Sequence, residues 1–130
     1  MKLPEELQFM QNSMLPQKRT STRMEGKVCV VSGATSGVGY QAAKALAKGG
    51  AHIVMVCRNA EKARKVQEEL ASLYGTKVDF FIADFKQLAQ VSRAAKKIAR
   101  EYPKIDILIN NAGVFNRRRR LTADGNEEVF

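Results

Sequence analysis

Residues 32–39 read Ser-Gly-Ala-Thr-Ser-Gly-Val-Gly, which has the composition of a phosphate-binding turn. The segment follows a short β-rich run and precedes a helix-like segment, the context in which such glycines can hold phosphate. Gly33 permits a tight turn, Gly37 lets the backbone approach a diphosphate, and Gly39 lets the helix pack closely on the sheet. Backbone N–H groups at the helix start favour the negative charge. The predicted cofactor-binding residues of this turn are Gly33, Ala34, Thr35, Ser36, Gly37, Val38 and Gly39. The alternative is a strand-to-helix turn that binds nothing.

Alternating strand-like and helix-like segments must position this turn. The predicted strands cover residues 28–31, 53–57, 78–83 and 105–109. Predicted helices cover 40–48, the segment between Asn59 and Gly75, and the segment between Asp84 and Pro103. Because the strands lack polar alternation, they indicate a parallel sheet covered on both faces. The fold class is therefore α/β, a Rossmann-type doubly wound half in the order β-α-β-α-β-α-β.

Apolar periodicity assigns the helix faces that pack on the sheet. In the first helix Ala43 and Leu46 face the sheet. The buried faces of the later helices are predicted to be Ala63, Val66, Leu70 and Leu73, and then Leu88, Val91, Ala95, Ile98 and Tyr102. Asp124 with Glu127 three residues on has the spacing of a capping box, which predicts a further helix truncated by the end of the chain.

Length and composition exclude several classes of protein. The 130 residues are 45% hydrophobic and 27% charged, as in one ordinary domain. Residues 1–26, with two of the three prolines, are predicted to be an N-terminal extension to a truncated half-domain at 27–130. The apolar runs are too short to span a membrane, and a single histidine gives no basis for a metal site. Two cysteines indicate a reduced compartment, so an intracellular, cytoplasmic location is expected. The net charge of +9 favours anionic partners.

The glycine spacing is G-x-x-x-G-x-G, which resembles the short-chain dehydrogenase/reductase family. The Asn-Asn-Ala-Gly after the fourth predicted strand is similar to that family's motif, and residues 56–59 and 121–125 are similar to retinol dehydrogenase-like members. The resemblance covers residues 27–130. It implies that Asp84 contacts the adenine and that the following residues line the cofactor cleft: Asn110, Asn111, Ala112 and Gly113. An alternative for Asp84 is that it caps the next helix with Gln87.

The end of the second predicted strand bears on the choice of cofactor. An NAD-selective site needs an acid there to bind the ribose 2′-OH, whereas this chain has Cys57 followed by Arg58. A guanidinium can bind a 2′-phosphate in a bidentate manner, which favours NADP(H). Arg58 and Asn59 therefore join the predicted cofactor site. A solvated position at the helix start is the alternative for Arg58, and Cys57 is interpreted as a small core residue.

No catalytic residue is predicted. The resembling family uses a Tyr-x-x-x-Lys pair, and the one numerical match, Tyr40 with Lys44, falls in the first helix beside the phosphate turn, where the family does not place its base. The resemblance implies an NADP(H)-dependent oxidoreductase acting on a small carbonyl or alcohol substrate, of which this chain is the cofactor-binding N-terminal part. The alternative is a catalytically inactive nucleotide- or partner-binding module from a truncated isoform. Alone, the chain is expected to bind NADP(H) weakly, to turn over no substrate and to expose strand 105–109 as an apolar edge.

Four consecutive cations follow the Asn-Asn-Ala-Gly motif: Arg117, Arg118, Arg119 and Arg120. The functional interpretations are peripheral contact with an acidic membrane surface and contact with an anionic substrate, and the alternative is a solvated loop. Nucleic acid is not an expected partner, because no aromatic or glycine pattern of an RNA-binding module accompanies the run.

Overall fold

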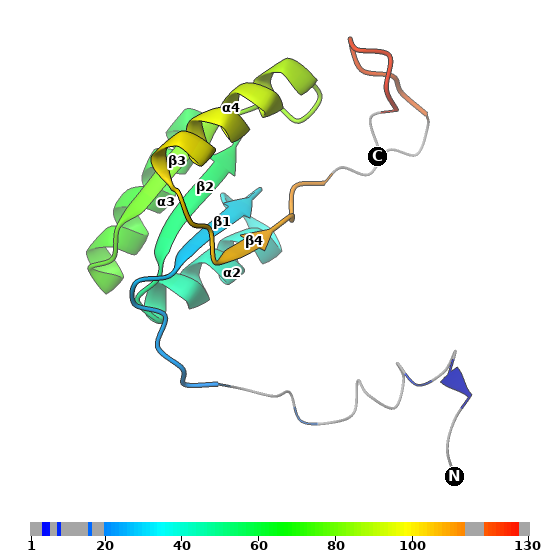
Figure 1. Ribbon diagram of the computed structural model, residues 1–130. Helices are drawn as coiled ribbons and strands as arrows, with labels where there is room; N and C mark the ends of the chain where they lie inside the picture. The colour runs from blue at the N-terminus through cyan, green and yellow to red at the C-terminus, as the bar shows by residue number, and fades with distance from the viewer. Residues whose placement is uncertain (1–3, 6–7, 9–15, 17–19, 114–118, 128–130) are drawn as a thin grey trace.

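The computed structural model describes residues 4–5, 8, 16, 20–113 and 119–127. Within these residues a parallel sheet of four strands is joined by crossover helices (Figure 1). The elements are, in order, β1 (Val28–Ser32), α2 (Gly37–Lys48), β2 (His52–Cys57), α3 (Ala60–Tyr74), β3 (Val78–Ile82), α4 (Leu88–Glu101) and β4 (Ile107–Ile109). The alternation confirms the predicted Rossmann-type order, and α2 begins three residues earlier than predicted.

The strand order in the sheet is β3-β2-β1-β4. β1 pairs with β2 from Val28 opposite His52 onward, and on its other side with β4, where Cys29 lies opposite Ile107. β2 and β3 therefore lie on one side of β1, and β4 lies on the other side. β4 is shorter than predicted, and the side chain of Leu108 is 60% exposed. The expected apolar edge is thus present on a strand of three residues.

Helices cover both faces of the sheet, as the unbroken apolar strands require. Small side chains, including Ala43, Ala47 and Ala63, let α2 and α3 pack on one face around Ile53 and Met55. α4 packs on the other face through Ala94, Ile98 and Tyr102, against residues that include Val30, Val54 and Val56 (Figure 1). The ends of α3 follow the sequence prediction. Asn59 accepts a hydrogen bond from the backbone N–H of Lys62, and Gly75 ends the helix with a φ of 63°.

Two helix faces differ from the prediction. Leu73 is 58% exposed, and Tyr74 packs on the core in its place, one turn beyond Leu70. In α4 the buried alanine is Ala94 and not Ala95, and Leu88 is 58% exposed. A residue three or four positions along a helix lies on nearly the same face. The position of the sheet, which periodicity does not encode, decided between the neighbours.

The predicted further helix at the end of the chain is not present in the described residues. Residues 119–127 instead form a turn in which Leu121 bridges to Glu127 and the Thr122 N–H donates to the Asn126 carbonyl over 2.7 Å. At the other end, the Met24 N–H donates to the Gly49 carbonyl over 2.7 Å, and the Met24 side chain packs on the core. The last residues of the predicted extension therefore contact the domain.

Candidate functional site

A cleft of about 760 Å³ lies at the carboxyl ends of the strands. It is bounded by the glycine turn, by the loops that follow β2, β3 and β4, and by the turn at 119–127. Crossovers that leave neighbouring strands on opposite faces create such a crevice, which is where doubly wound sheets bind ligands. The structure brings the following predicted residues to its walls: Gly33, Thr35, Ser36, Arg58, Asn59, Asp84, Asn111, Ala112 and Gly113. Ala34, Gly37, Val38, Gly39 and Asn110 are not among the lining residues.

The glycine turn depends on close backbone approaches. Gly33 has a φ of 66°, and a Cβ there would lie 3.0 Å from the Cα of Ala112. At Gly39 a Cβ would lie 2.3 Å from the Gly33 carbonyl oxygen and 2.4 Å from the Asn111 Nδ2. Gly37 has a φ of 61° but faces open space. Gly33 and Gly39 thus let α2 approach the turn and the loop after β4, and only residues without a side chain fit at these two positions.

Ser32 joins the turn to the loop after β4. Its hydroxyl accepts hydrogen bonds from the backbone N–H groups of Asn111 at 3.0 Å and Ala112 at 3.1 Å, and donates to the Ile109 carbonyl at 3.4 Å. The Asn111 side chain donates to the Gly33 carbonyl at 3.3 Å. Ser32 is 5% exposed, so these bonds are protected from water. Ser32 was not among the predicted site residues: its place directly before Gly33 pointed to the site, but its bonds to residues 79 and 80 positions away could not be predicted from local sequence.

Basic side chains gather where β2 runs into α3. Arg58 and Lys62 are exposed and line the cleft, together with Asn59, whose cap fixes the first turn of α3. Lys62 was missed from the sequence, although its place one turn into the helix from Arg58 was readable. Cys57 also lines the cleft but is 3% exposed, and burial raises the pKa of its thiol. The prediction of Cys57 as a core residue is confirmed.

The capping role suggested for Asp84 is wrong. Its carboxylate accepts from the Lys86 N–H at 3.0 Å within the β3–α4 loop, and α4 begins four residues later. The Leu88 N–H at the start of α4 donates to the carboxylate of Asp124 at 3.0 Å. Asp124 therefore caps α4 across 36 positions of sequence, and does not begin a helix of its own. This contact joins the turn at 119–127 to the cleft wall.

No tyrosine lines the cleft among the residues that the structure describes. Tyr40 lies in α2, its hydroxyl donates to the carboxylate of Glu69 on α3, and Lys44 Nζ lies 6.0 Å from its ring centroid. The hydrogen bond to Glu69 raises the pKa of Tyr40, so the phenol holds its proton more tightly. This placement agrees with the rejection of Tyr40 and Lys44 as a catalytic pair.

The arginine run lies partly outside the described residues, because the structure describes Arg119 and Arg120 but not Arg117 and Arg118. Arg119 Nε lies 3.8 Å from a carboxylate oxygen of Glu127. Membrane contact through the run stays a prediction. None of the described helices combines the length and apolar character needed to cross a bilayer.

The site can now be compared with known proteins. A family model described as short chain dehydrogenase matches residues 27–130. Human retinol dehydrogenase 13 is 35% identical over 116 residues, which cover 88% of this chain and 34% of that protein. Human polyprenol dehydrogenase is 34% identical over 105 residues, covering 80% of this chain and 32% of its own length. The chain spans about a third of the length of these curated relatives.

The structure of this chain is also similar to a solved structure. L-Sorbose reductase from Gluconobacter frateurii, in complex with NADPH and L-sorbose, superposes with a TM-score of 0.70 and 30% sequence identity. The match covers 76% of this chain and 38% of that one. The predicted Rossmann-type fold is therefore confirmed both by the strand order and by this likeness.

Proposed function

This chain belongs to the short-chain dehydrogenase family, and from that premise we propose that it is the NADP(H)-binding part of an oxidoreductase acting on a carbonyl or alcohol substrate. The observation that carries the proposal is the placement of Arg58 and Lys62 in the same cleft as the glycine turn. When bound, NADP(H) supplies or accepts the hydride. The residues of this chain bind and orient that cofactor.

The glycine turn fits a diphosphate. Thr35 and Ser36 line the cleft at the start of α2, and Ser36 makes no capping bond with its side chain. The N–H groups at the first turn of a helix attract an anion when no side chain caps them. Gly33 and Gly39 place no side chain in this turn. The backbone of the turn is therefore proposed to bind the diphosphate.

The basic pair fits a 2′-phosphate. Arg58 offers a planar fork of donors for bidentate contact, and Lys62 offers a mobile ammonium. Cys57 carries no charge that would repel the phosphate, since burial raises the pKa of its thiol. These features favour NADP(H) over NAD(H), consistent with the NADPH bound by the sorbose reductase.

Two apolar side chains lie at the end of the cleft that is proposed for the adenine. Phe85 and Leu88 line it, and their side chains are 46% and 58% exposed. Covering these side chains with an aromatic base would remove apolar surface from water. Asp84 lies beside them and is proposed to contact the adenine. Asn111, Ala112 and Gly113 form the opposite wall next to the turn.

A second candidate is a binding module that performs no catalysis. It is favoured by the absence of a tyrosine from the cleft walls among the described residues. Both candidates bind the cofactor, and they differ in turnover. Because this chain alone is expected to turn over no substrate under either candidate, the test is the reading frame beyond Phe130. A Tyr-x-x-x-Lys motif there supports the oxidoreductase, and a frame without that motif supports the binding module.

The binding proposal is tested by titrating the 130-residue chain with NADPH and with NADH, following nicotinamide fluorescence. Arg58→Ala removes a charge-assisted contact and should weaken NADPH about 10- to 100-fold while changing NADH less than about threefold. Arg64→Ala is the matched control, since Arg64 is exposed on α3 and does not line the cleft. Equal losses for the two nucleotides, or for the two variants, would contradict the assignment of Arg58.

A further inference from the structure

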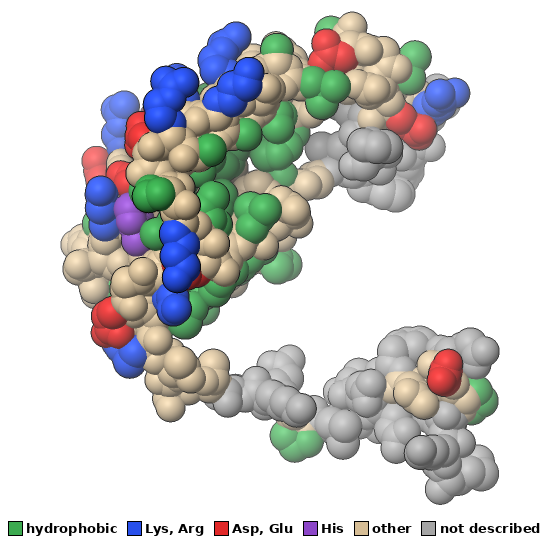
Figure 2. Space-filling view, viewed as in Figure 1, with side chains coloured by type: hydrophobic (Ala, Val, Ile, Leu, Met, Phe, Trp, Pro, Cys, Tyr) green, Lys and Arg blue, Asp and Glu red, His purple; other side chains and the backbone are tan. Residues whose placement is uncertain are grey.

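A basic stripe runs along the solvent side of α4, formed by Arg93, Lys96, Lys97 and Arg100. All four side chains are exposed, and Figure 2 shows Lys and Arg side chains gathered along this helix. Within the part of the chain that the structure describes, none of them forms an ion pair with an acidic side chain. Like charges four residues apart on a helix repel each other. The stripe therefore leaves a concentrated positive charge without compensation.

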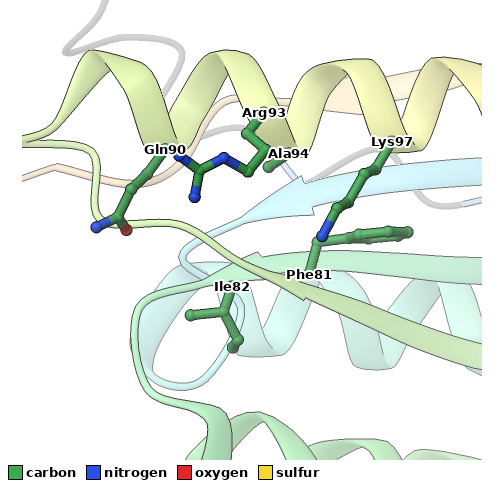
Figure 3. Close-up of a pocket in the computed structure, with 6 residues that line it drawn as sticks. All are labelled: Phe81, Ile82, Gln90, Arg93, Ala94 and Lys97. Carbon is green, nitrogen blue, oxygen red and sulfur yellow. The ribbon is translucent and has the colours of Figure 1, made fainter.

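A small pocket of about 100 Å³ lies between this stripe and strand β3. Phe81 and Ile82 come from β3, and Gln90, Arg93, Ala94 and Lys97 come from α4 (Figure 3). In Figure 3 the Lys97 side chain reaches from α4 toward β3, with Phe81 beneath it, and the Arg93 side chain extends along α4 toward Gln90. The pocket is larger than the roughly 10–15 Å³ that one water needs. Arg93 and Lys97 therefore place two cations at its rim.

Among the described residues β3 is an edge strand of the sheet, with no strand paired on its outer side. The Ile53 N–H donates to the Lys77 carbonyl and the Ala83 N–H donates to the Cys57 carbonyl, so odd-numbered residues of this segment turn their backbone groups toward β2. Backbone groups alternate along a strand, which turns those of Phe80 and Ile82 outward. The Val78 carbonyl already accepts from the Gln67 side chain at 2.7 Å, so the part of the edge that can act as a template for another chain is at Phe80 and Ile82.

We propose that this edge and the basic stripe together bind an extended acidic segment of a partner protein, which adds a strand beside β3. Arg93 and Lys97 lie four residues apart, about 6 Å along a helix axis. Alternate residues of an extended strand lie about 6.6 Å apart. Carboxylates at alternate positions of the segment therefore point to the α4 side of the sheet and match the two cations, whereas the residues between them point to the opposite side.

This surface is separate from the nucleotide cleft. None of the six residues that line the pocket is among those that line the cleft. An anionic membrane would respond to the charge of the whole stripe, whereas an added strand needs the edge of β3 and the two cations above it. The strand edge favours the peptide, and the difference defines the test.

The probe is a capped, fluorescein-labelled peptide of five Glu-Val repeats, titrated with the full chain and followed by anisotropy. Arg93→Gln with Lys97→Gln should weaken binding by about tenfold or more. The matched control is Lys96→Gln with Arg100→Gln, which removes the same charge from the same helix beside the pocket and should change binding less than about threefold. A peptide with every valine replaced by proline keeps the glutamates but loses backbone donors to the strand edge, and it should bind at least about tenfold more weakly.

Three outcomes overturn the proposal. The first is no saturable binding of the alternating peptide. The second is an equal loss from the two variant pairs, which means that bulk charge alone attracts the peptide. The third is binding to phosphatidylserine vesicles that exceeds binding to the peptide and is weakened equally by both pairs. Arg58→Ala should leave peptide binding unchanged, so failure of the nucleotide assignment does not affect this result.

Discussion

Gly39→Ala tests whether α2 packs on the glycine turn as closely as the structure shows. The added methyl group would lie 2.3 Å from the Gly33 carbonyl oxygen and 2.4 Å from the Asn111 Nδ2. Neither atom moves freely, because one belongs to the turn backbone and the other donates to that same carbonyl at 3.3 Å. Relief of the overlap requires α2, the turn or the Asn111 side chain to shift.

The magnitude follows from three contributions. Overpacking of a well-packed site costs about 1–3 kcal/mol, and loss of the Asn111 hydrogen bond costs about 0.5–1.5 kcal/mol. Alanine is more favourable than glycine inside a helix by about 1 kcal/mol, which acts in the opposite direction. We therefore expect the free energy of unfolding to fall by about 1–3 kcal/mol. The Tm should fall by roughly 5–15 °C.

Urea and thermal unfolding followed by circular dichroism measure this loss. Gly113→Ala is the matched control, because its Cβ would meet no atom closer than the Asn111 carbonyl oxygen at 3.9 Å. It should change the free energy of unfolding by less than about 0.5 kcal/mol. A Gly39→Ala chain as stable as the wild type would refute the packing argument. NADPH affinity should fall with Gly39→Ala as well, since the displaced turn is the proposed diphosphate site.

Two further predictions concern contacts far apart in sequence. Asp124→Ala removes the cap of α4, so the Leu88 amide should exchange its hydrogen roughly 2- to 30-fold faster, as measured by NMR. Asp124→Asn should retain most of the protection. Equal exchange rates in the two variants would contradict the cap. Burial works against ionisation of Asp79, but hydrogen bonds from Tyr102 and His52 outweigh it and hold the pKa below its usual 3.8. Because the unfolded state then takes up the proton first, the stabilisation is present above pH 3.8 and is lost as the pH falls through the lower folded-state pKa. Asp79→Asn should therefore unfold with a flatter pH dependence in that range by urea titration, and an unchanged slope would refute the contribution of Asp79.

Much of the fold follows from local sequence. The glycine turn, the cap at Asn59 and the left-handed Gly75 are each specified by residues within a few positions of one another. The alternation of apolar strands and amphipathic helices then predicts a parallel sheet with crossovers of one hand. The pairing of β1 with β4 does not follow from the alternation alone, since a crossover of the same hand could have placed β4 beside β3; it follows from the doubly wound order that the motifs imply.

Tertiary structure decided what depends on distant partners. The periodicity of α4 permits either Ala94 or Ala95 to be buried, and the position of the sheet selected Ala94. The cap of α4 comes from Asp124, because a carboxylate can satisfy a helix N–H from any point in the sequence that the fold brings near. The hydrogen bonds between Ser32 and the loop after β4 could not be predicted from local sequence for the same reason. Local rules thus determined the elements and their order, while long-range contacts determined the walls of the cleft.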